Sequence, residues 1–443
     1  MTTQQGSQER SVISDSHRTR LFAASCIALI ATAMTFAIRG DIIGDLGKEF
    51  TLSKEQLGSA AGAWAYGFAI SIFIGGQLVD ALGMGRILAL AFLAHVAGIV
   101  TTIFAGGFWM LFLATLAVGL GNGLIEAAVN PLIATIYPDR KTAKLNQLHV
   151  WFPGGIVIGG LVSYAMSGMG LGWKMKMAII LVPVVVYGLM FLGKQFPATE
   201  RVQQGISTAG MYREALRPLF LIILFCMILT ASTELAPNQW IPNIMTTTAA
   251  VSGILVLVWI NGLMAVGRTF AGAIVHKLSP IGLLIASSAL SALGLFSLSQ
   301  ANSRVSAFAA ATVFAIGICY FWPTMLGVTS ERFPKGGAFL LAIVGGTGTL
   351  SVAIFTWVMG GFLDRFTAEA IPVGTTIDQL QNAAPGTELA RQWTLAQAQG
   401  GAMSLRYMAI LPVILIVIFS SVWLYDRARG GYKAVNLAEE HTS

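Results

Sequence analysis

Apolar segments of about 20 residues recur along this 443-residue chain, from residue 21 to residue 425. A helix needs about 20 such residues to cross the hydrocarbon core of a bilayer. Only 11% of the residues are charged, against roughly a quarter in a soluble globular domain. A transmembrane β-barrel would instead show stretches of about ten residues with alternating polarity. The sequence therefore predicts an all-α protein that crosses the membrane many times.

The apolar windows predict twelve membrane spans. They lie near residues 21–39, 57–79, 86–105, 108–136, 145–168, 174–196, 218–240, 250–275, 279–300, 303–330, 337–363 and 403–425. An even number of spans places both termini on one side, and 18 of the 27 Lys and Arg residues fall on that side. By the positive-inside rule both termini are predicted to be cytoplasmic, in a multi-pass protein of the cell or inner membrane. The first 20 residues lack an apolar stretch, so no cleavable signal peptide is expected.

The chain divides into two similar halves. We expect an N-terminal tail (1–20), a six-helix bundle (21–196), a cytoplasmic linker (197–217), a second six-helix bundle (218–425) and a C-terminal tail (426–443). The halves resemble each other at a shift of about 196 residues; Trp64 corresponds to Trp259, and Gly76 to Gly272. Parallel six-helix repeats are typical of secondary transporters, whose binding site lies near the midplane between the repeats.

The segment GGQLVDALGMGR, from Gly75 to Arg86, carries the first family resemblance. It resembles the signature loop between spans two and three of the major facilitator superfamily. The resemblance implies two rocking six-helix bundles, with Asp80 and Arg86 at the cytoplasmic rim, where charges can hold one state closed. A looser second copy begins at Gly267 and contains Arg268.

Two further segments resemble a narrower group, the fucose, galactose and glucose proton symporters. They are GLGNGLIEAAVNP in span four and LNQLHVWFPGG at the start of span five. In that family an aspartate in span one and a glutamate in span four carry proton coupling and sugar contact. The resemblance places these roles on Asp41 and Glu126. Asp41 follows Arg39 at the outer end of span one, where it could also be neutralised or solvated.

Polar residues inside membrane spans are functional candidates by default, because charge is costly there. Asn122, Glu126 and Asn130 recur at four-residue spacing and therefore share one face of a helix. Glu126, Asp41 and Glu234 are the predicted proton-coupling residues. The predicted substrate-binding residues are Asn130, Asn146, His149, Asn238, Gln239, Asn261 and Trp322; the predicted gating residues are Arg39, Asp80, Arg86, Arg268 and Glu331.

Each candidate also has a structural interpretation. The asparagines could hold helices together, and Trp322 could simply pack. Arg39 could reach outward to water or pair with Asp41, Asp45 or Glu234. Arg268 is expected to pair with Glu331 or Asp364 in a cytoplasmic gate.

Several function classes lack their motifs. The sequence has no P-loop, nucleophile elbow or paired metal-ligand motif, so we expect no enzyme, no cofactor and no metal site. Cys26, Cys226 and Cys319 lie in apolar segments and are expected to be core residues. No basic run with interleaved aromatics indicates nucleic-acid binding, and the net charge of +7 is explained by topology.

The leading prediction is a transporter, expected to be monomeric, that moves a small hydroxylated solute such as a monosaccharide together with H⁺. Amides, hydroxyls, carboxyls and aromatic rings suit a neutral ligand with many hydroxyl groups. Efflux antiport of a small organic compound, uptake of an organic anion, coupling to Na⁺ and a non-transporting membrane sensor remain alternatives.

Overall fold

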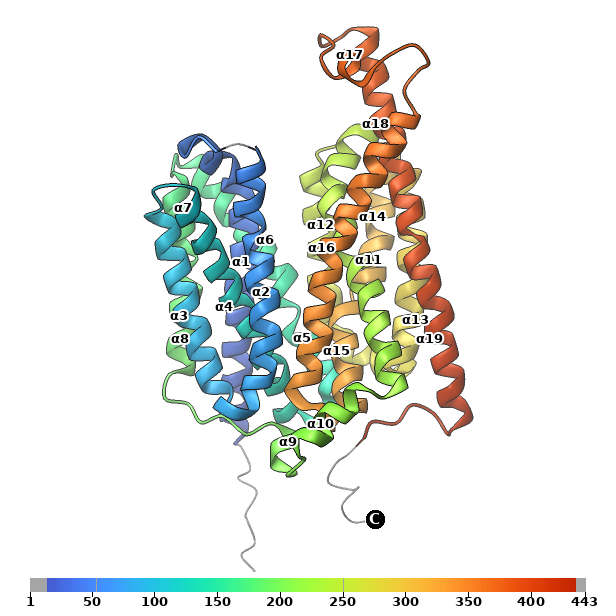
Figure 1. The fold of residues 1–443 in the computed structure, drawn as a ribbon. Helices are drawn as coiled ribbons and strands as arrows, with labels where there is room; N and C mark the ends of the chain where they lie inside the picture. The colour runs from blue at the N-terminus through green and yellow to red at the C-terminus, as the bar shows by residue number, and fades with distance from the viewer. Residues whose placement is uncertain (1–13, 53, 250, 436–443) are drawn as a thin grey trace, which may run out of the picture.

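The computed structural model describes residues 14–52, 54–249 and 251–435, and within these ranges it contains helices but no β-strand. The helices form two bundles that stand side by side (Figure 1). The first contains α1 (Asp15–Glu49), α2 (Lys54–Leu82), α3 (Met84–Ile103), α4 (Phe108–Ile136), α5 (Lys141–Leu148), α6 (Trp151–Gly168), α7 (Trp173–Ile179) and α8 (Leu181–Phe191).

The second bundle is reached through two short helices, α9 (Glu200–Gln203) and α10 (Thr208–Ala215). It contains α11 (Pro218–Thr248), α12 (Gly253–Thr269), α13 (Ala271–Ser299), α14 (Arg304–Ile318), α15 (Phe321–Arg332), α16 (Gly337–Glu369), α17 (Ile377–Gln381), α18 (Glu388–Met408) and α19 (Ile410–Ala428). Helices α9 and α10 lie at the same end of the molecule as the first turn of α1 and the last turn of α19 (Figure 1). We call this end the terminal side.

Eleven helical segments among the described residues are long and apolar enough to cross a membrane, and Leu255–Thr269 is a shorter apolar helix. Together they confirm the predicted twelve-helix all-α fold. The predicted eighth span, 250–275, is too long, because its helix ends at Thr269 and α13 begins at Ala271. The ninth span bends at Ser279, whose φ is 61°, because the residue before Pro280 is disfavoured in helical geometry.

Two other predicted spans are broken where a proline removes a helical hydrogen bond. The helix is interrupted by a turn between α5 and α6, at the residue four positions before Pro153, and between α14 and α15, at the residue four positions before Pro323. An α-helical carbonyl normally accepts from the N–H four residues later. The carbonyl groups of His149 and Cys319 therefore have no such donor.

Glycines allow close helix contacts inside the first bundle. A Cβ atom on Gly119 of α4 would overlap the backbone of Trp64 in α2, and one on Gly67 of α2 would overlap the carbonyl of Leu116 in α4. Small residues at such crossings are a general feature of membrane helix packing. This contact fixes Trp64 beside the part of α4 that carries the site.

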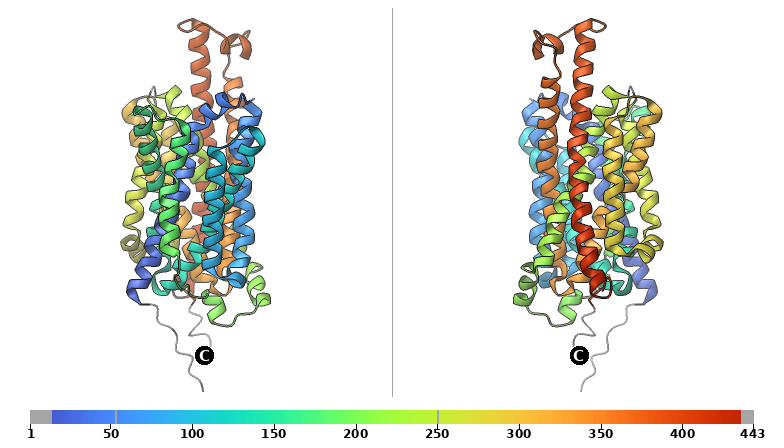
Figure 2. Two further views of the ribbon diagram at one scale, coloured as in Figure 1. Left: turned by 90° about the vertical axis from the view of Figure 1, so that its left-hand side faces the viewer. Right: turned by 90° about the vertical axis from the view of Figure 1, so that its right-hand side faces the viewer.

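The second bundle extends beyond the first at the end of the molecule opposite the terminal side (Figures 1 and 2). Helices α18 and α19 together span 41 residues, or about 60 Å at 1.5 Å per residue, whereas the hydrocarbon core is about 30 Å thick. The stretch between the last two predicted spans, about 366–402, therefore contains the end of α16, all of α17 and most of α18.

The two bundles meet most closely on the terminal side (Figure 1). There α2 packs against α16, where a Cβ on Gly76 would overlap Ala342, and α5 packs against α15, where a Cβ on Gly327 would overlap Thr142. On the opposite side, the ion pairs among the described residues, such as Lys176–Asp41 and Arg365–Glu369, each join residues of the same bundle. The structure is thus closed on the terminal side.

Candidate functional site

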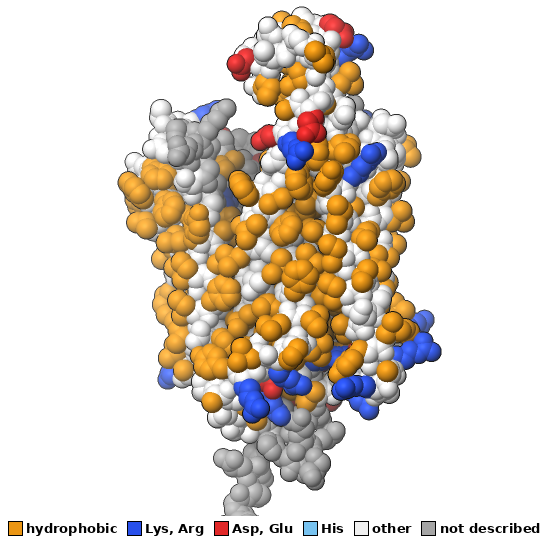
Figure 3. Space-filling view, turned by 45° about the vertical axis from the view of Figure 1, so that its right-hand side comes forward, with side chains coloured by type: hydrophobic (Ala, Val, Ile, Leu, Met, Phe, Trp, Pro, Cys, Tyr) orange, Lys and Arg blue, Asp and Glu red, His pale blue; other side chains and the backbone are white. Residues whose placement is uncertain are grey.

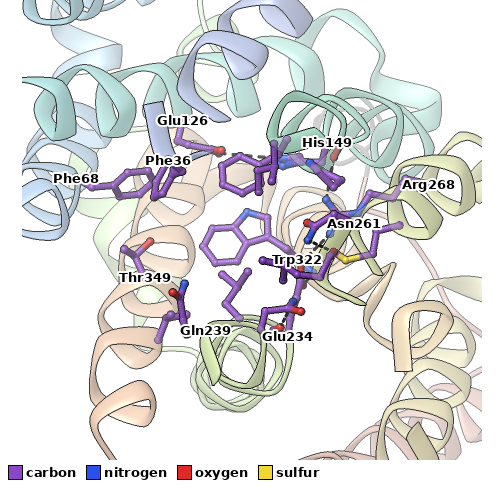
Figure 4. Close-up of a pocket in the computed structure, with 18 of the residues that line it drawn as sticks. Phe36, Phe68, Glu126, His149, Glu234, Gln239, Asn261, Arg268, Trp322 and Thr349 are labelled. Carbon is purple, nitrogen blue, oxygen red and sulfur yellow. Dashed lines mark hydrogen bonds and ion pairs between the residues drawn. The ribbon is translucent and has the colours of Figure 1, made fainter. Parts of the chain in front are cut away.

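A cavity of about 200 Å³ lies between the two bundles. Its walls come from α1, α2, α4 and α6 of the first bundle and from α11, α12, α15 and α16 of the second. The aromatic lining residues are Phe36, Trp64, Phe68, Phe152 and Trp322; the polar ones are Glu126, His149, Glu234, Asn238, Gln239, Asn261, Arg268 and Thr349. Figure 4 shows Trp322 between Glu126 and Glu234, which lie on opposite sides of the cavity. An apolar lining with a few converging polar groups is typical of small-molecule sites.

The polar group of the first bundle consists of Glu126, Asn130 and His149. The Asn130 amide donates to Glu126 Oε2 at 2.6 Å, as their four-residue spacing on α4 allows. The amide oxygen of Asn130, Oδ1, lies 3.0 Å from His149 Nε2. Since the amide nitrogen is used by Glu126, we assign the hydrogen of this second bond to Nε2 of His149. Asn130 therefore links a carboxyl on α4 to an imidazole at the end of α5.

Arg268 joins the two bundles at the cavity wall. Its Nη2 donates to Glu234 Oε1 at 2.8 Å, its Nη1 to the carbonyl of His149 at 2.8 Å, and its Nε to the carbonyl of Cys319 at 2.6 Å. Both carbonyls are the ones freed by the prolines four residues later. Arg268 is 2% exposed, so a buried guanidinium needs these acceptors to offset its lost hydration.

Glu234 and Asn238 repeat on α11 the carboxyl-amide spacing of α4. The Asn238 amide donates to the carbonyl of Glu234 at 2.7 Å, and its Oδ1 is buried without a hydrogen-bond partner. Because a buried unsatisfied acceptor is costly, this oxygen is suited to accept a hydrogen bond from a ligand. Gln239 and Asn261, two of the predicted substrate-binding residues, also line the cavity.

Two predicted substrate-binding residues lie outside the cavity lining. Asn146 is fully buried, and its amide donates to Thr324 Oγ1 at 3.1 Å across the contact between α5 and α15. Asn130 stands behind Glu126 and His149. Helical periodicity gives the face on which a residue lies but not its depth, and both residues are too close to the terminal side to reach the cavity.

The predicted outer charges have other partners than expected. Asp41 accepts from Lys176 at 2.6 Å and from Ser163 at 2.7 Å, and it does not line the cavity. Arg39 forms no ion pair among the described residues; its guanidinium lies 5.6 Å from the Phe36 ring and 5.4 Å from the Trp64 ring. Of the two alternatives for Arg39, the pairing with Asp41, Asp45 or Glu234 does not occur, because the guanidinium lies against aromatic faces instead.

The expected gate partner of Arg268 is also wrong. Arg268 pairs with Glu234 in the cavity wall and with neither Glu331 nor Asp364. Glu331 instead accepts from the backbone and hydroxyl of Thr142 in the first bundle, at 3.0 and 2.6 Å. Its second oxygen accepts from the hydroxyl of Tyr432 at 2.6 Å. Glu331 therefore sits in the contact that closes the terminal side.

The linker completes this closure. Asp80 accepts from Arg201 at 2.6 Å and from Thr199 at 2.5 Å, and both side chains of the ion pair are buried. The neighbouring Glu200 pairs with Lys141 at 2.6 Å. Arg86 takes no part in these contacts, because its Nη1 donates to the carbonyl of Leu82 on the surface. Asp80 thus lies at the rim, as expected, but its cationic partner comes from α9.

Most of the residues that line the cavity could not be identified from the sequence. Phe36, Trp64, Phe68, Phe152 and Thr349 line the cavity, but their types are equally common on faces that contact lipid or other helices. The sequence contains one indication that Trp64 is functional, because the residue is repeated as Trp259 in the second half. Trp259 itself is half-exposed and bonds Thr312, so the repeat alone does not mark the cavity.

The family model described as Major Facilitator Superfamily matches residues 21–356. This chain belongs to that family. It is 24% identical over 147 residues to the D-xylose transporter of Levilactobacillus brevis, covering 33% of this chain and about a third of that protein's length (32%). It is 23% identical over 309 residues to the hexuronate transporter of Bacillus subtilis strain 168, covering 62% of this chain and 70% of that protein.

Solved structures of sugar symporters share the fold. The E. coli fucose:proton symporter superposes with a TM-score of 0.67 at 14% identity, covering 89% of this chain and 98% of that one. The proton:xylose symporter superposes with a TM-score of 0.73 at 15% identity, covering 92% and 96%. The chain is thus a superfamily transporter that resembles the sugar symporters, as its motifs predicted.

Proposed function

We propose that this transporter moves a small, neutral, hydroxylated solute by alternating access and couples the movement to a proton carried by Glu126. The cavity between the bundles is the proposed solute site. Its polar groups come from both bundles, so a bound solute would contact both halves at once. The likeness to the fucose and xylose proton symporters supports this reading.

The observation that carries the proposal is the unequal surroundings of the two cavity carboxyls. Glu234 is paired with Arg268 at 2.8 Å. Glu126 is 4% exposed, and its hydrogen-bond partner is the neutral amide of Asn130. His149 Nε2 is 3.9 Å from Glu126 Oε2 and is directed to Asn130. A buried carboxylate without a cationic partner is costly, and binding a proton removes its charge. Glu126 is therefore the better proton carrier.

The same geometry favours a neutral solute over an anion. All three nitrogens of the Arg268 guanidinium already donate within the protein, to Glu234 and to two backbone carbonyls. Nη1 and Nη2 each keep one further N–H, but the positive charge of Arg268 is already balanced by Glu234, so an organic anion would enter a buried site without a free counter-charge. Asn238 Oδ1, the amides of Gln239 and Asn261 and the hydroxyl of Thr349 can instead meet hydroxyl groups, while Trp64 and Trp322 offer flat apolar faces.

The test is transport by the purified full chain in proteoliposomes, with D-xylose, L-fucose and D-glucuronate as probes. We expect a neutral sugar to accumulate when the proton gradient is directed inward. The E126Q variant keeps the size and hydrogen bonding of the side chain but cannot carry a proton. We expect it to lose accumulation and to retain counterflow exchange. The control D139N removes an exposed carboxyl outside the cavity and should accumulate sugar normally.

Each other outcome has a defined meaning. Normal accumulation by E126Q would refute proton carriage by Glu126. Uptake of D-glucuronate without uptake of either neutral sugar would refute the neutral substrate class. Accumulation that requires an outward-directed proton gradient would identify an efflux antiporter. Ligand binding without any flux would identify a membrane sensor.

A further inference from the structure

A second, larger hollow lies outside the site, on the outer surface of the second bundle between α11 and α19. It is a groove of about 750 Å³, within the roughly 300–1,000 Å³ range of ligand pockets. Nine of its ten lining residues are hydrophobic or aromatic, and Ser421 is the exception. Phe225, Val417 and Tyr425 are 48%, 63% and 50% exposed. The groove is therefore open to the surroundings of the protein along an apolar face.

Basic side chains gather at one end of this groove. Pro218, at its terminal end, is the first residue of α11 and directly follows Arg217, whose side chain is 52% exposed. On the other wall, the guanidinium of Arg429 lies 4.4 Å from the centre of the Tyr425 ring. Figure 3 shows hydrophobic side chains over this face and Lys and Arg side chains gathered at its terminal end.

The nearby acids leave a positive charge at this end. Glu214 accepts from Arg217 at 3.0 Å, so one cation is partly neutralised. Asp426 is buried and paired with Arg332, so it does not neutralise Arg429. The N-terminus of the 31-residue helix α11 adds partial positive charge at the same place.

The positive charge at the terminal end of the groove indicates which kind of molecule the groove binds. A neutral lipid would gain from the apolar walls alone, and an apolar transmembrane helix would not balance the net positive charge at this end of the groove. An acyl chain that ends in an anionic headgroup satisfies both parts of the groove, because basic pockets between helices bind such headgroups. We propose that the groove binds an anionic phospholipid, with an acyl chain against α11 and α19 and the phosphate near Arg217 and Arg429.

The test is native mass spectrometry of the detergent-purified full chain, titrated with dioleoyl phosphatidylglycerol or dioleoyl phosphatidylcholine. We expect phosphatidylglycerol to bind at least about 10-fold more tightly. The R217A/R429A variant should bind it about 30-fold more weakly, from roughly 1 kcal/mol for each basic residue, with its phosphatidylcholine binding unchanged. The control R20A/K194A removes two cations from the terminal side of the first bundle and should bind like the wild type.

A second variant tests the apolar part. V417W places a large ring in the groove and should weaken the binding of both lipids. Equal affinities of the wild type for the two lipids would overturn the proposal. So would equal effects of R217A/R429A and R20A/K194A, or unchanged phosphatidylglycerol binding by V417W, because the lipid would then be bound elsewhere.

Discussion

Removing the hydroxyl of Tyr432 should loosen the terminal side of the transporter. Residues 430–435 follow α19 and run back to α15, where the Tyr432 hydroxyl donates to Glu331 and the Val435 backbone donates to the Glu331 carbonyl at 2.8 Å. The same carboxylate accepts two hydrogen bonds from Thr142 of the first bundle. Tyr432 therefore positions the acceptor that holds the two bundles together.

The size of the effect follows from the contacts. A hydrogen bond to a charged group contributes about 1.5–3 kcal/mol. Tyr432 is partly exposed, and Glu331 keeps both bonds from Thr142 in Y432F, so the lower end, about 1.5 kcal/mol, applies. Tyr432 and Glu331 both belong to the second bundle, so only the part of this loss that weakens the two bonds from Thr142 favours the form open on the terminal side. The full loss would shift the equilibrium by about 10-fold, which is the upper limit of the expected effect.

The shift can be measured by electron–electron resonance between spin labels at A81C and A428C, two exposed positions on the terminal ends of α2 and α19. The native cysteines are buried and should not be labelled. Burial and the neighbouring Glu331 raise the pKa of Tyr432 well above its ordinary value of 10. The hydroxyl therefore remains a donor below that pKa, and the effect of Y432F should be constant from about pH 6 to about pH 9. A distance distribution equal to that of Y164F, which removes an exposed hydroxyl, would refute the reasoning.

Two further predictions concern the linker and the core of the first bundle. D80N leaves Arg201 buried without its counter-ion, and breaking such a pair costs about 3–5 kcal/mol. We therefore expect trypsin to cleave at Arg201 faster in D80N than in the control D139N, which changes an exposed carboxyl. Unchanged cleavage would contradict the role of the pair. G119A places a methyl group against the Trp64 backbone and should lower the thermal midpoint of the protein, whereas G160A, where a Cβ meets nothing within 4 Å, should not; equal midpoints would show that the helices separate at little cost.

The periodic features of the fold could be read from the sequence. Span length predicted the twelve helices, and four-residue spacing placed Glu126 and Asn130 on one face of α4. Glu234 and Asn238 are also four residues apart on α11, and both line the cavity. These inferences needed only helical geometry, which is local along the chain.

Features that depend on how the bundles meet could not be read in this way. The partner of Arg268 was assigned from its distance along the helix, but a long side chain reaches Glu234 on a neighbouring helix instead of the terminal side. Asn146 is a residue type that often binds hydroxylated ligands, but it lies in the contact between the two bundles. The cation that pairs with Asp80 comes from the linker, for which the sequence shows no periodic pattern.

The contact between Arg268 and the His149 carbonyl bears on how this transporter would appear in a mutational scan. The acceptor is a main-chain atom, so every amino acid at position 149 supplies it, and replacing the His149 side chain leaves the bond intact. The residue that makes this carbonyl available is Pro153, and within the described part of the chain no hydrogen bond joins Pro153 to Arg268. Replacing Pro153 would restore an N–H that competes with the guanidinium for the same oxygen. The hydrogen bond between Arg268 and the His149 carbonyl, which joins the two bundles, thus depends on Pro153, a residue that a list of side-chain contacts of Arg268 would not include.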